Sequence, residues 1–288
     1  MRDGCCIKQH LLKHCQRRCF EVSVANMTVS GYISSWRGIL FTVSVMAVSA
    51  FQNIPMVSFP CGAVAASPHP KLFATTATVV DIDEDAVRDI QTMDQWANAC
   101  GVQRVEGFQL TMDRDGTDCS VMTTRNLQAN QPALMVPNGM ILAGGKAREE
   151  FGIAHAAEEL LLYGSVDASE YLPQFYLFLK ILKEHELGDQ SPWYPWLNSL
   201  PRFFSNGASL TRWCTDCLPV LAGELANSER IRYSKYCRAL DCIDFLNQRT
   251  KRHKDLTQWA FAVVCTRSFP TTNGDMQIIP MADMVCIY

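Results

Sequence analysis

The stretch WAFAVVCTRSFPTTNGDMQIIPMADM, from Trp259 to Met284, decides the fold of this chain. It consists of an apolar run, an isolated Thr266–Arg267 pair, a Gly-Asp turn, a second apolar run and a single carboxylate at Asp283. Short apolar runs bounded by turn residues are typical of buried strands. The pattern therefore predicts a strand, a functional arginine at its end, and a second strand that leads to a buried Asp283.

Arg267 has two interpretations, because an obligate cation follows directly on an apolar run. As a structural residue, it would extend its charged end into solvent or pair with Asp283. As a functional residue, its planar guanidinium would bind a carboxylate with two parallel hydrogen bonds. Asp283 is likewise either a binding residue or a plain carboxylate at a strand end, and the sequence leaves both interpretations open.

Composition and charge are those of an ordinary globular protein. The 288 residues are 48% hydrophobic and 19% charged, which is enough to bury a substantial core, and the length allows one or two domains. The net charge is -3 and the pI is about 6.1, whereas nucleic-acid-binding proteins usually carry a basic stripe. We therefore expect no nucleic-acid partner.

Residues 1–80 have the composition of a leader. No acidic residue occurs between Glu21 and Asp81, and the apolar run Gly38–Ala50 ends in small residues. A membrane span needs about 20 apolar residues, so this shorter run predicts a signal peptide and no stable membrane insertion. The acid-free stretch after it resembles the bipartite plastid leaders of algae. A plastid location is predicted, with a disordered N-terminus of a cytoplasmic protein as the alternative, and either Met1 or Met27 as the start.

The thirteen cysteines do not form a convincing metal motif. Cys214, Cys217, Cys237 and Cys242 have a spacing that loosely matches a four-thiolate zinc site. However, four residues separate the second pair, and residues 218–246 have the pattern of two helices. Cysteines at helical spacing are more often small core residues, so no metal is predicted.

The middle of the chain changes from a strand pattern to a helical one. Asp81 and Asp83 can cap a helix that ends at Gly101. Short runs between residues 107 and 143 predict a small β core with tight turns. Residues 147–256 are predicted to be mainly helical, including an apolar helix that stops at Gly188. The Pro- and Trp-rich residues 191–204 predict a stiff, packed connector that is not a regular helix.

These segments together resemble the SET-domain protein methyltransferases, specifically the Rubisco large-subunit methyltransferase-like branch. The resemblance rests on the Arg-x-Phe of Arg267 to Phe269, the Pro-hydrophobic-Ala-Asp run that ends at Asp283, the strands between Ser120 and Leu142, and the helix and aromatic turn of residues 170–204.

The resemblance implies an α+β fold in which a SET-domain β core of the β-clip type is split by a large α-helical insert. It also implies four parts. These are a leader at 1–80, an N-terminal helix with the first SET strands at 81–148, the helical insert at 149–256, and the start of the C-terminal SET segment at 257–288, with the C-terminal part missing.

The function implied by the resemblance is S-adenosylmethionine-dependent protein-lysine N-methylation, with a lysine-bearing protein as substrate. The cofactor-binding positions that it implies are Arg267, Phe269, Asp283 and Cys119. Cys119 lies in the segment Gly116–Ser120, which corresponds to the family's glycine-rich loop but keeps only one glycine. Cys286 and Ile287 occupy the positions of the family's Asn-His pair, and the family's catalytic tyrosine lies beyond the end, so no catalytic residue is assigned. We expect impaired activity in a truncated chain, or alternatively a non-catalytic protein-interaction (pseudoenzyme) role. The methyl acceptor and the oligomeric state are not predicted.

Overall fold

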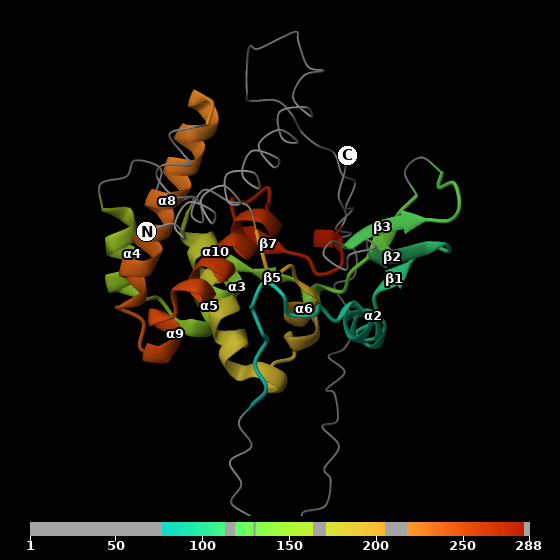
Figure 1. Ribbon diagram of the computed structural model, residues 1–288, viewed down its shortest axis with the longest axis horizontal. Helices are drawn as coiled ribbons and strands as arrows, with labels where there is room; N and C mark the ends of the chain where they lie inside the picture. Colours follow the sequence, from blue (N-terminus) through green and yellow to red (C-terminus); the bar gives the residue numbers. More distant parts are fainter. Residues whose placement is uncertain (1–76, 113–118, 129–130, 164–170, 205–217, 285–288) are drawn as a thin grey trace, which may run out of the picture. The chain divides into compact units, whose positions relative to one another are not determined.

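The computed structural model describes residues 77–112, 119–128, 131–163, 171–204 and 218–284 (Figure 1). Every described residue belongs to one compact unit. The predicted leader lies almost entirely outside the described residues. Packing begins slightly before the predicted Asp81, because Val80 is buried and the carbonyl of Thr78 accepts a hydrogen bond from Asp189 N at 2.8 Å. None of the helices in the described ranges has the length and apolar character needed to cross a membrane.

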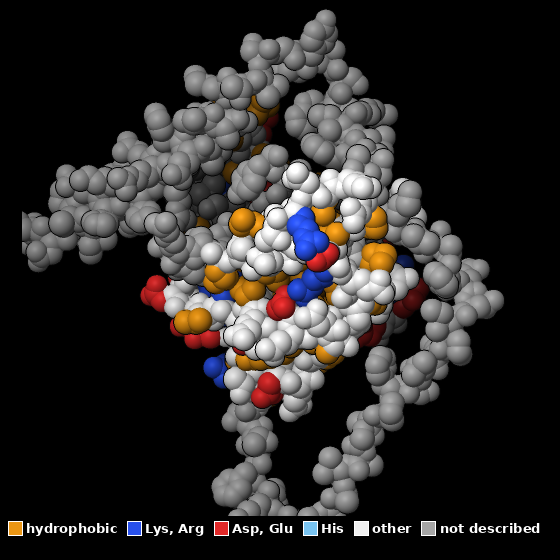
Figure 2. Space-filling model, turned by 90° about the vertical axis from the view of Figure 1, so that its right-hand side faces the viewer, with side chains coloured by type: hydrophobic (Ala, Val, Ile, Leu, Met, Phe, Trp, Pro, Cys, Tyr) orange, Lys and Arg blue, Asp and Glu red, His pale blue; other side chains and the backbone are white. Residues whose placement is uncertain are grey.

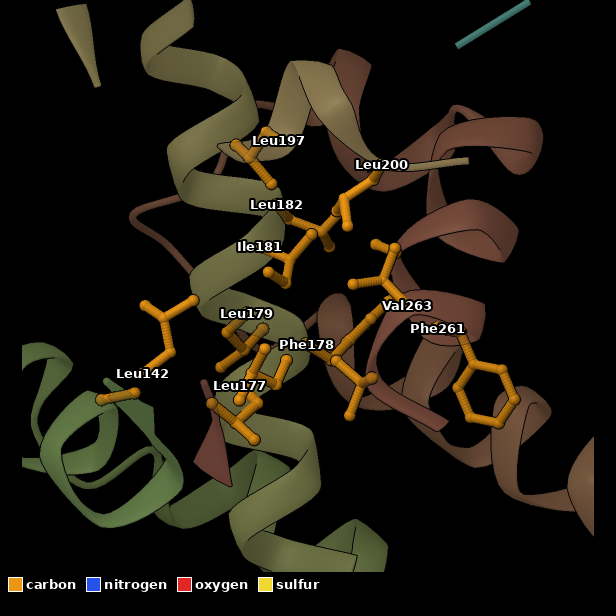
Figure 3. Packing of buried hydrophobic residues seen from close by; sticks show 14 of the residues in the cluster. Leu142, Leu177, Phe178, Leu179, Ile181, Leu182, Leu197, Leu200, Phe261 and Val263 are labelled. Carbon is orange, nitrogen blue, oxygen red and sulfur yellow. The ribbon is translucent and has the colours of Figure 1, made fainter. Parts of the chain in front are cut away.

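Helix α5 (Tyr171–Leu187) is the centre of the hydrophobic core. The sequence predicts one broad apolar stripe on this helix, but Leu177 and Ile181 are fully buried as well, so α5 is covered around most of its circumference. Helices α3 (Gly144–Phe151) and α10 (Lys254–Arg267) pack against it. In Figure 3, Leu177 and Leu179 lie beside Leu142, and Leu182 lies beside Leu200 and Val263.

In the described residues, three small antiparallel sheets accompany the helices. Strand β1 (Gln103–Arg104) pairs with β4 (Leu134–Met135), and β2 (Phe108–Met112) pairs with β3 (Cys119–Thr123). The third sheet has the order β5-β7-β6, formed by Leu142–Ala143, Met276–Ile278 and Ser268–Pro270.

The third sheet joins segments from both sides of the helices. Leu142 pairs with Ile278, and Phe269 pairs with Gln277. The chain between β5 and β6 therefore forms a helical insert within one sheet, which confirms the predicted α+β fold of a small β core split by helices.

The apolar run Trp259–Cys265 is helical, so the predicted strand is wrong. It belongs to α10, whose first turn is capped by His253 Nδ1 accepting from Leu256 N at 3.2 Å. Residues Trp259–Val264 are all buried. A segment that is buried on every side shows no helical period, and a continuous apolar run cannot be distinguished from a buried strand by pattern alone.

The helix predicted from Asp81 begins later, at Ile90, and forms α2 (Ile90–Ala99). Asp89 is its N-cap and accepts a hydrogen bond from Thr92 N at 2.9 Å. Asp81 instead accepts from Asp83 N in a turn. The predicted end is confirmed, because Gly101 has a φ of 85° directly after the helix.

The insert contains two further differences from the sequence pattern. The connector predicted to lack a regular helix contains α6 (Tyr194–Ser199), because Pro195 lies in its first turn, where a missing N–H is tolerated. Residues 218–246, predicted as two helices, form one long helix α8 (Val220–Leu240) followed by turns. The remaining helices of the described insert are α4 (His155–Leu162), which packs on α8, and α9 (Gln248–Arg252), which packs on α10.

A partly buried polar cluster ties α3, α4 and α5 together. Arg148 donates two hydrogen bonds to Glu158, from Nε at 2.8 Å and from Nη2 at 2.9 Å, and this contact lowers the pKa of Glu158. Tyr176 donates its hydroxyl to Glu158 Oε1 at 2.6 Å and accepts from Ala154 N at 3.0 Å. The cluster thus satisfies a carboxylate that is only 8% exposed.

We expect Tyr176→Phe to lower the free energy of unfolding by about 1–3 kcal/mol, because it leaves Glu158 and the Ala154 amide without their buried partner. Urea denaturation followed by circular dichroism measures the change. Tyr163→Phe is the matched control, because Tyr163 is 83% exposed, and we expect it to stay within about 0.5 kcal/mol of the wild type. Equal stability of the two variants would contradict the role of the Tyr176 hydroxyl.

Candidate functional site

The candidate site lies where α10 ends and β6 begins. Arg267 is the last residue of α10, and Asp283 belongs to the 3-10 turn η4 (Ala282–Met284). Arg267 Nη1 donates to the main-chain oxygen of Asp283 at 2.5 Å and lies 3.7 Å from its Oδ2. The pairing that the sequence offers as the structural interpretation is therefore present.

A third side chain reaches this pair from the helical insert. Trp196 of α6 donates its indole Nε1–H to Asp283 Oδ2 at 3.1 Å. The other oxygen, Oδ1, is buried and has no hydrogen-bond partner among the described residues. Burial of the whole carboxyl raises the pKa of Asp283 to about 6, while the charge of Arg267 and the Trp196 hydrogen bond act in the opposite direction.

Part of the Arg267 guanidinium is not used by these contacts. In the described part of the chain, its other N–H groups have no hydrogen-bond partner, and the side chain is 15% exposed. Its Cζ lies 5.9 Å from the centre of the Phe204 ring. Among the described residues, Asp283 is therefore the hydrogen-bond partner of the guanidinium, through Nη1.

Phe204 also lines a hollow of about 1120 Å³, together with His185 and Arg202. Arg202 is 8% exposed, and its guanidinium donates to the carbonyls of Val87 and Asn198. Arg267 and Asp283 do not line this hollow. A smaller hollow of about 370 Å³, lined by Tyr171 and Arg232, is formed by α4, α5 and α8 and does not include them either.

The structure places the other two predicted cofactor-binding residues near this pair, each on its own strand. Phe269 follows Arg267 by two residues and is 44% exposed in β6. Cys119 is the first residue of β3 and is 4% exposed. Strand β3 packs against η4, as Figure 1 shows, so the segment that carries Cys119 adjoins the segment that carries Asp283. The glycine-poor loop before Cys119 lies outside the described residues.

Two residues of the site are not predicted from the sequence. Trp196 is 87 positions from Asp283, and Phe204 is 63 positions from Arg267, counted from their residue numbers. Both lie in the Pro- and Trp-rich connector of residues 191–204, which the sequence pattern predicts only to be packed in the core. An excess of aromatic residues within the predicted insert is the one signal that marks this segment.

The cysteine cluster and the charged surface offer no second centre in the regions that can be described. Cys237 and Cys242 are half-buried, and burial raises the pKa of the Cys237 thiol. Within the described ranges, no three His, Cys, Asp or Glu side chains are arranged to hold a metal ion. Cys214 and Cys217 lie outside those ranges. On the face shown in Figure 2, basic side chains lie beside acidic ones and not in a single basic patch.

Comparison with known proteins gives a match in structure alone. No family model and no curated protein matches the sequence. Rubisco LSMT bound to AdoMet matches with a TM-score of 0.50 and 17% identity, over 69% of this chain and 44% of that chain. The SET domain of LSMT bound to lysine and AdoHcy matches with a TM-score of 0.52 and 17% identity, over 69% of this chain and 45% of that chain.

A third structure, Rubisco LSMT bound to sinefungin and monomethyllysine, matches with a TM-score of 0.50 and 18% identity, over 68% of this chain and 44% of that chain. The chain thus spans less than half the length of the structures it matches. The resemblance inferred from the sequence is confirmed at the level of the fold: this chain has the SET-domain fold of LSMT.

Proposed function

We propose that this chain belongs to an S-adenosylmethionine-dependent protein-lysine methyltransferase of the SET type, and that Arg267 binds the carboxylate of the cofactor. One observation carries the proposal. In a SET fold, Arg267 is held on one side by Asp283 and has unpaired N–H groups on the other, among the residues described. The names of the matched structures support the same ligand class, because they contain AdoMet, AdoHcy and sinefungin.

The residues around Arg267 fit an amino-acid carboxylate. A guanidinium binds a carboxylate best with two parallel N–H donors, and such charge-assisted bonds are stronger than neutral ones. Asp283 fixes one edge of the fork, so little conformational freedom is lost when the other edge binds. Phe269, which is 44% exposed, adds an aromatic surface two residues away. Cys119, which is 4% exposed, is proposed as a wall residue of the site.

The cofactor would supply a methyl group on a sulfonium. Its transfer to a lysine is an in-line displacement, in which the S–C bond breaks as the N–C bond forms and the amine loses its proton. The described residues contribute by holding the donor in place, since orientation is the main protein contribution to such a step. We assign no catalytic residue among them.

Isothermal titration of the purified chain with S-adenosylhomocysteine tests the proposal. We expect saturable binding with a stoichiometry of one ligand per chain, since each chain has one Arg267 guanidinium to bind the carboxylate. Titration with adenosine alone serves as a control, because it lacks the carboxylate that Arg267 would bind. No heat of binding from S-adenosylhomocysteine, in protein shown to be folded by circular dichroism, would contradict the proposal.

One observation favours a second candidate, a non-catalytic protein-interaction role. The first turns of α8 expose Val220, Leu221 and Leu225 at 75%, 80% and 63%. An uncovered apolar helix face is typical of a surface that binds another protein. The titration separates the two roles, because a folded chain that binds no S-adenosylhomocysteine retains only the interaction role.

We further propose that residues 27–80 direct the protein to a plastid. The support is the acid-free composition of this segment and the short apolar run Gly38–Ala50. A fusion of residues 27–80 to a fluorescent reporter, expressed in an alga with a complex plastid, is expected to give plastid fluorescence. Replacing Val43 and Val45 with aspartate would interrupt the apolar run and serves as the control. Diffuse cytosolic fluorescence from the unchanged leader would refute the location.

A further inference from the structure

Three side chains from separate segments meet at one buried carboxylate. Trp196 comes from α6 in the helical insert, Arg267 from the end of α10, and Asp283 from η4. Trp196 and the Asp283 side chain are fully buried, whereas Arg267 keeps some exposure. Asp283 therefore connects Trp196 of the insert to Arg267. Of these three side chains, Arg267 is the one with an exposed fraction.

We propose that Trp196 is a positioning residue for cofactor binding: Arg267 Nη1 is held by the main-chain oxygen of Asp283, and the indole N–H of Trp196 keeps the Asp283 carboxylate from taking up the other N–H groups, which bind the ligand. The inference rests on the proposed function, because it concerns the same arginine. Trp196 lies in the insert and does not contact the ligand itself. Its effect on the affinity for the cofactor is exerted through Asp283.

The distances indicate which contact fixes the carboxylate. Arg267 Nη1 is 3.7 Å from Asp283 Oδ2, which is beyond the range of a good hydrogen bond. Trp196 Nε1 is 3.1 Å from the same oxygen, and Oδ1 has no partner among the described residues. The terminal torsion of an aspartate is intrinsically broad. The indole is therefore the side-chain hydrogen-bond donor to this carboxyl in the described structure, and the main-chain N–H groups of Met281 and Asp283 also favour its charged form.

The consequence for Arg267 follows from that orientation. With Asp283 held by Trp196, the carboxylate attracts Arg267 through space but does not close on it as a two-point ion pair. Without the indole N–H, Asp283 is free to rotate toward the guanidinium and to take up the N–H groups that the ligand needs. We therefore expect Trp196→Phe to weaken binding of S-adenosylhomocysteine by about tenfold, the effect of losing one charge-assisted hydrogen bond.

A double-mutant cycle separates positioning from packing. If Trp196 acts through Asp283, Trp196→Phe should change the dissociation constant by less than about twofold once Asp283→Ala is present. If Trp196 only supports the core, the two substitutions should have independent effects, and the inference would be wrong. Trp259→Phe is the matched control, because Trp259 is also buried and donates its indole N–H at 2.8 Å, but to Pro201 O. We expect this control to leave the dissociation constant unchanged.

A ligand-free measurement keeps the inference testable if the chain binds no S-adenosylhomocysteine. The indole N–H resonance of Trp196, identified by its absence in Trp196→Phe, should shift with pH as Asp283 ionises, with a midpoint near the pKa of about 6. Arg267 is the charged side chain that the described structure places beside the Asp283 carboxylate, at 3.7 Å, and its charge lowers the pKa of Asp283. The shift should disappear in Asp283→Asn. A Trp196 resonance that does not respond to pH would overturn the inference, whereas a failed titration with a responsive resonance would overturn only the proposed function.

Discussion

Replacing Arg267 with methionine should lower the affinity for S-adenosylhomocysteine by about 100-fold or more. The substitution removes both N–H groups that would bind the carboxylate, and each hydrogen bond to a charged group contributes about 1.5–3 kcal/mol. Methionine keeps much of the length and apolar character of the side chain, so contact with Phe204 is retained in part. Isothermal titration measures the dissociation constant directly.

The Arg267→Met variant should remain folded, which makes the binding result interpretable. Arg267 lowers the pKa of Asp283, so its loss raises that pKa further above the present value of about 6. At neutral pH the buried carboxyl then takes up a proton and no unpaired charge is left in the core. Thermal unfolding followed by circular dichroism should therefore show a cooperative transition.

Two further variants sharpen this prediction. Arg267→Lys retains the charge but not the planar fork, so we expect an intermediate loss of about tenfold. Arg252→Met is the control, because Arg252 is also the last residue of a helix, α9, but is exposed. A folded Arg267→Met variant that binds with the affinity of the wild type would exclude Arg267 as the carboxylate-binding residue.

Local signals explain which parts of the fold are predictable from the sequence. The ends of α2 and α5 are correct because Gly101 and Gly188 both adopt positive φ values, at 85° and 55°, which glycine accommodates. Strands β2 and β3 are correct because their branched and apolar runs are short and bounded by turn residues. In each case the residues that determine the structure are neighbours in the sequence.

The sequence pattern misleads where burial, or a contact between residues far apart in the sequence, determines the structure. The prediction of a strand for the apolar run Trp259–Cys265 is wrong because Trp259–Val264 are all buried, which removes the period of 3.6 from the sequence pattern. At the site, Arg267 and Asp283 are predictable because a charged residue next to an apolar run stands out. Trp196 is not, because its role depends on a contact that folding makes across 87 positions. Pattern alone cannot separate a tryptophan that donates to a buried carboxylate from one that only fills space.

A close approach of α3 and α5 leads to the second large prediction, a loss of stability in Gly144→Ala. A Cβ on Gly144 would lie 2.4 Å from Pro173 O and 2.6 Å from Pro173 Cα, which are main-chain atoms in the first turn of α5. Main-chain atoms cannot rotate away, so α3 and α5 would have to separate. We expect the free energy of unfolding to fall by about 3 kcal/mol or more, at the upper end of the usual cost of overpacking.

Neighbouring glycines provide a graded test of this close approach. A Cβ on Gly145 would meet only the side chain of Asp275, at 3.0 Å from Oδ2, and that group can move, so Gly145→Ala should cost less than Gly144→Ala. A Cβ on Gly139 would meet no atom within 4 Å, so Gly139→Ala should stay within about 0.5 kcal/mol of the wild type. Urea denaturation of the three variants measures the series, and equal stability of Gly144→Ala and Gly139→Ala would contradict it.

The same contact also connects the core to the site. Helix α3 follows directly on β5, and β5 pairs with β7, which in turn pairs with the strand β6 that begins after Arg267. A displacement of α3 away from α5 therefore acts on the sheet that positions Phe269 and the end of α10. If Gly144→Ala still folds at low temperature, we expect it to bind S-adenosylhomocysteine more weakly than Gly139→Ala, although Gly144 is not among the residues proposed to bind the ligand.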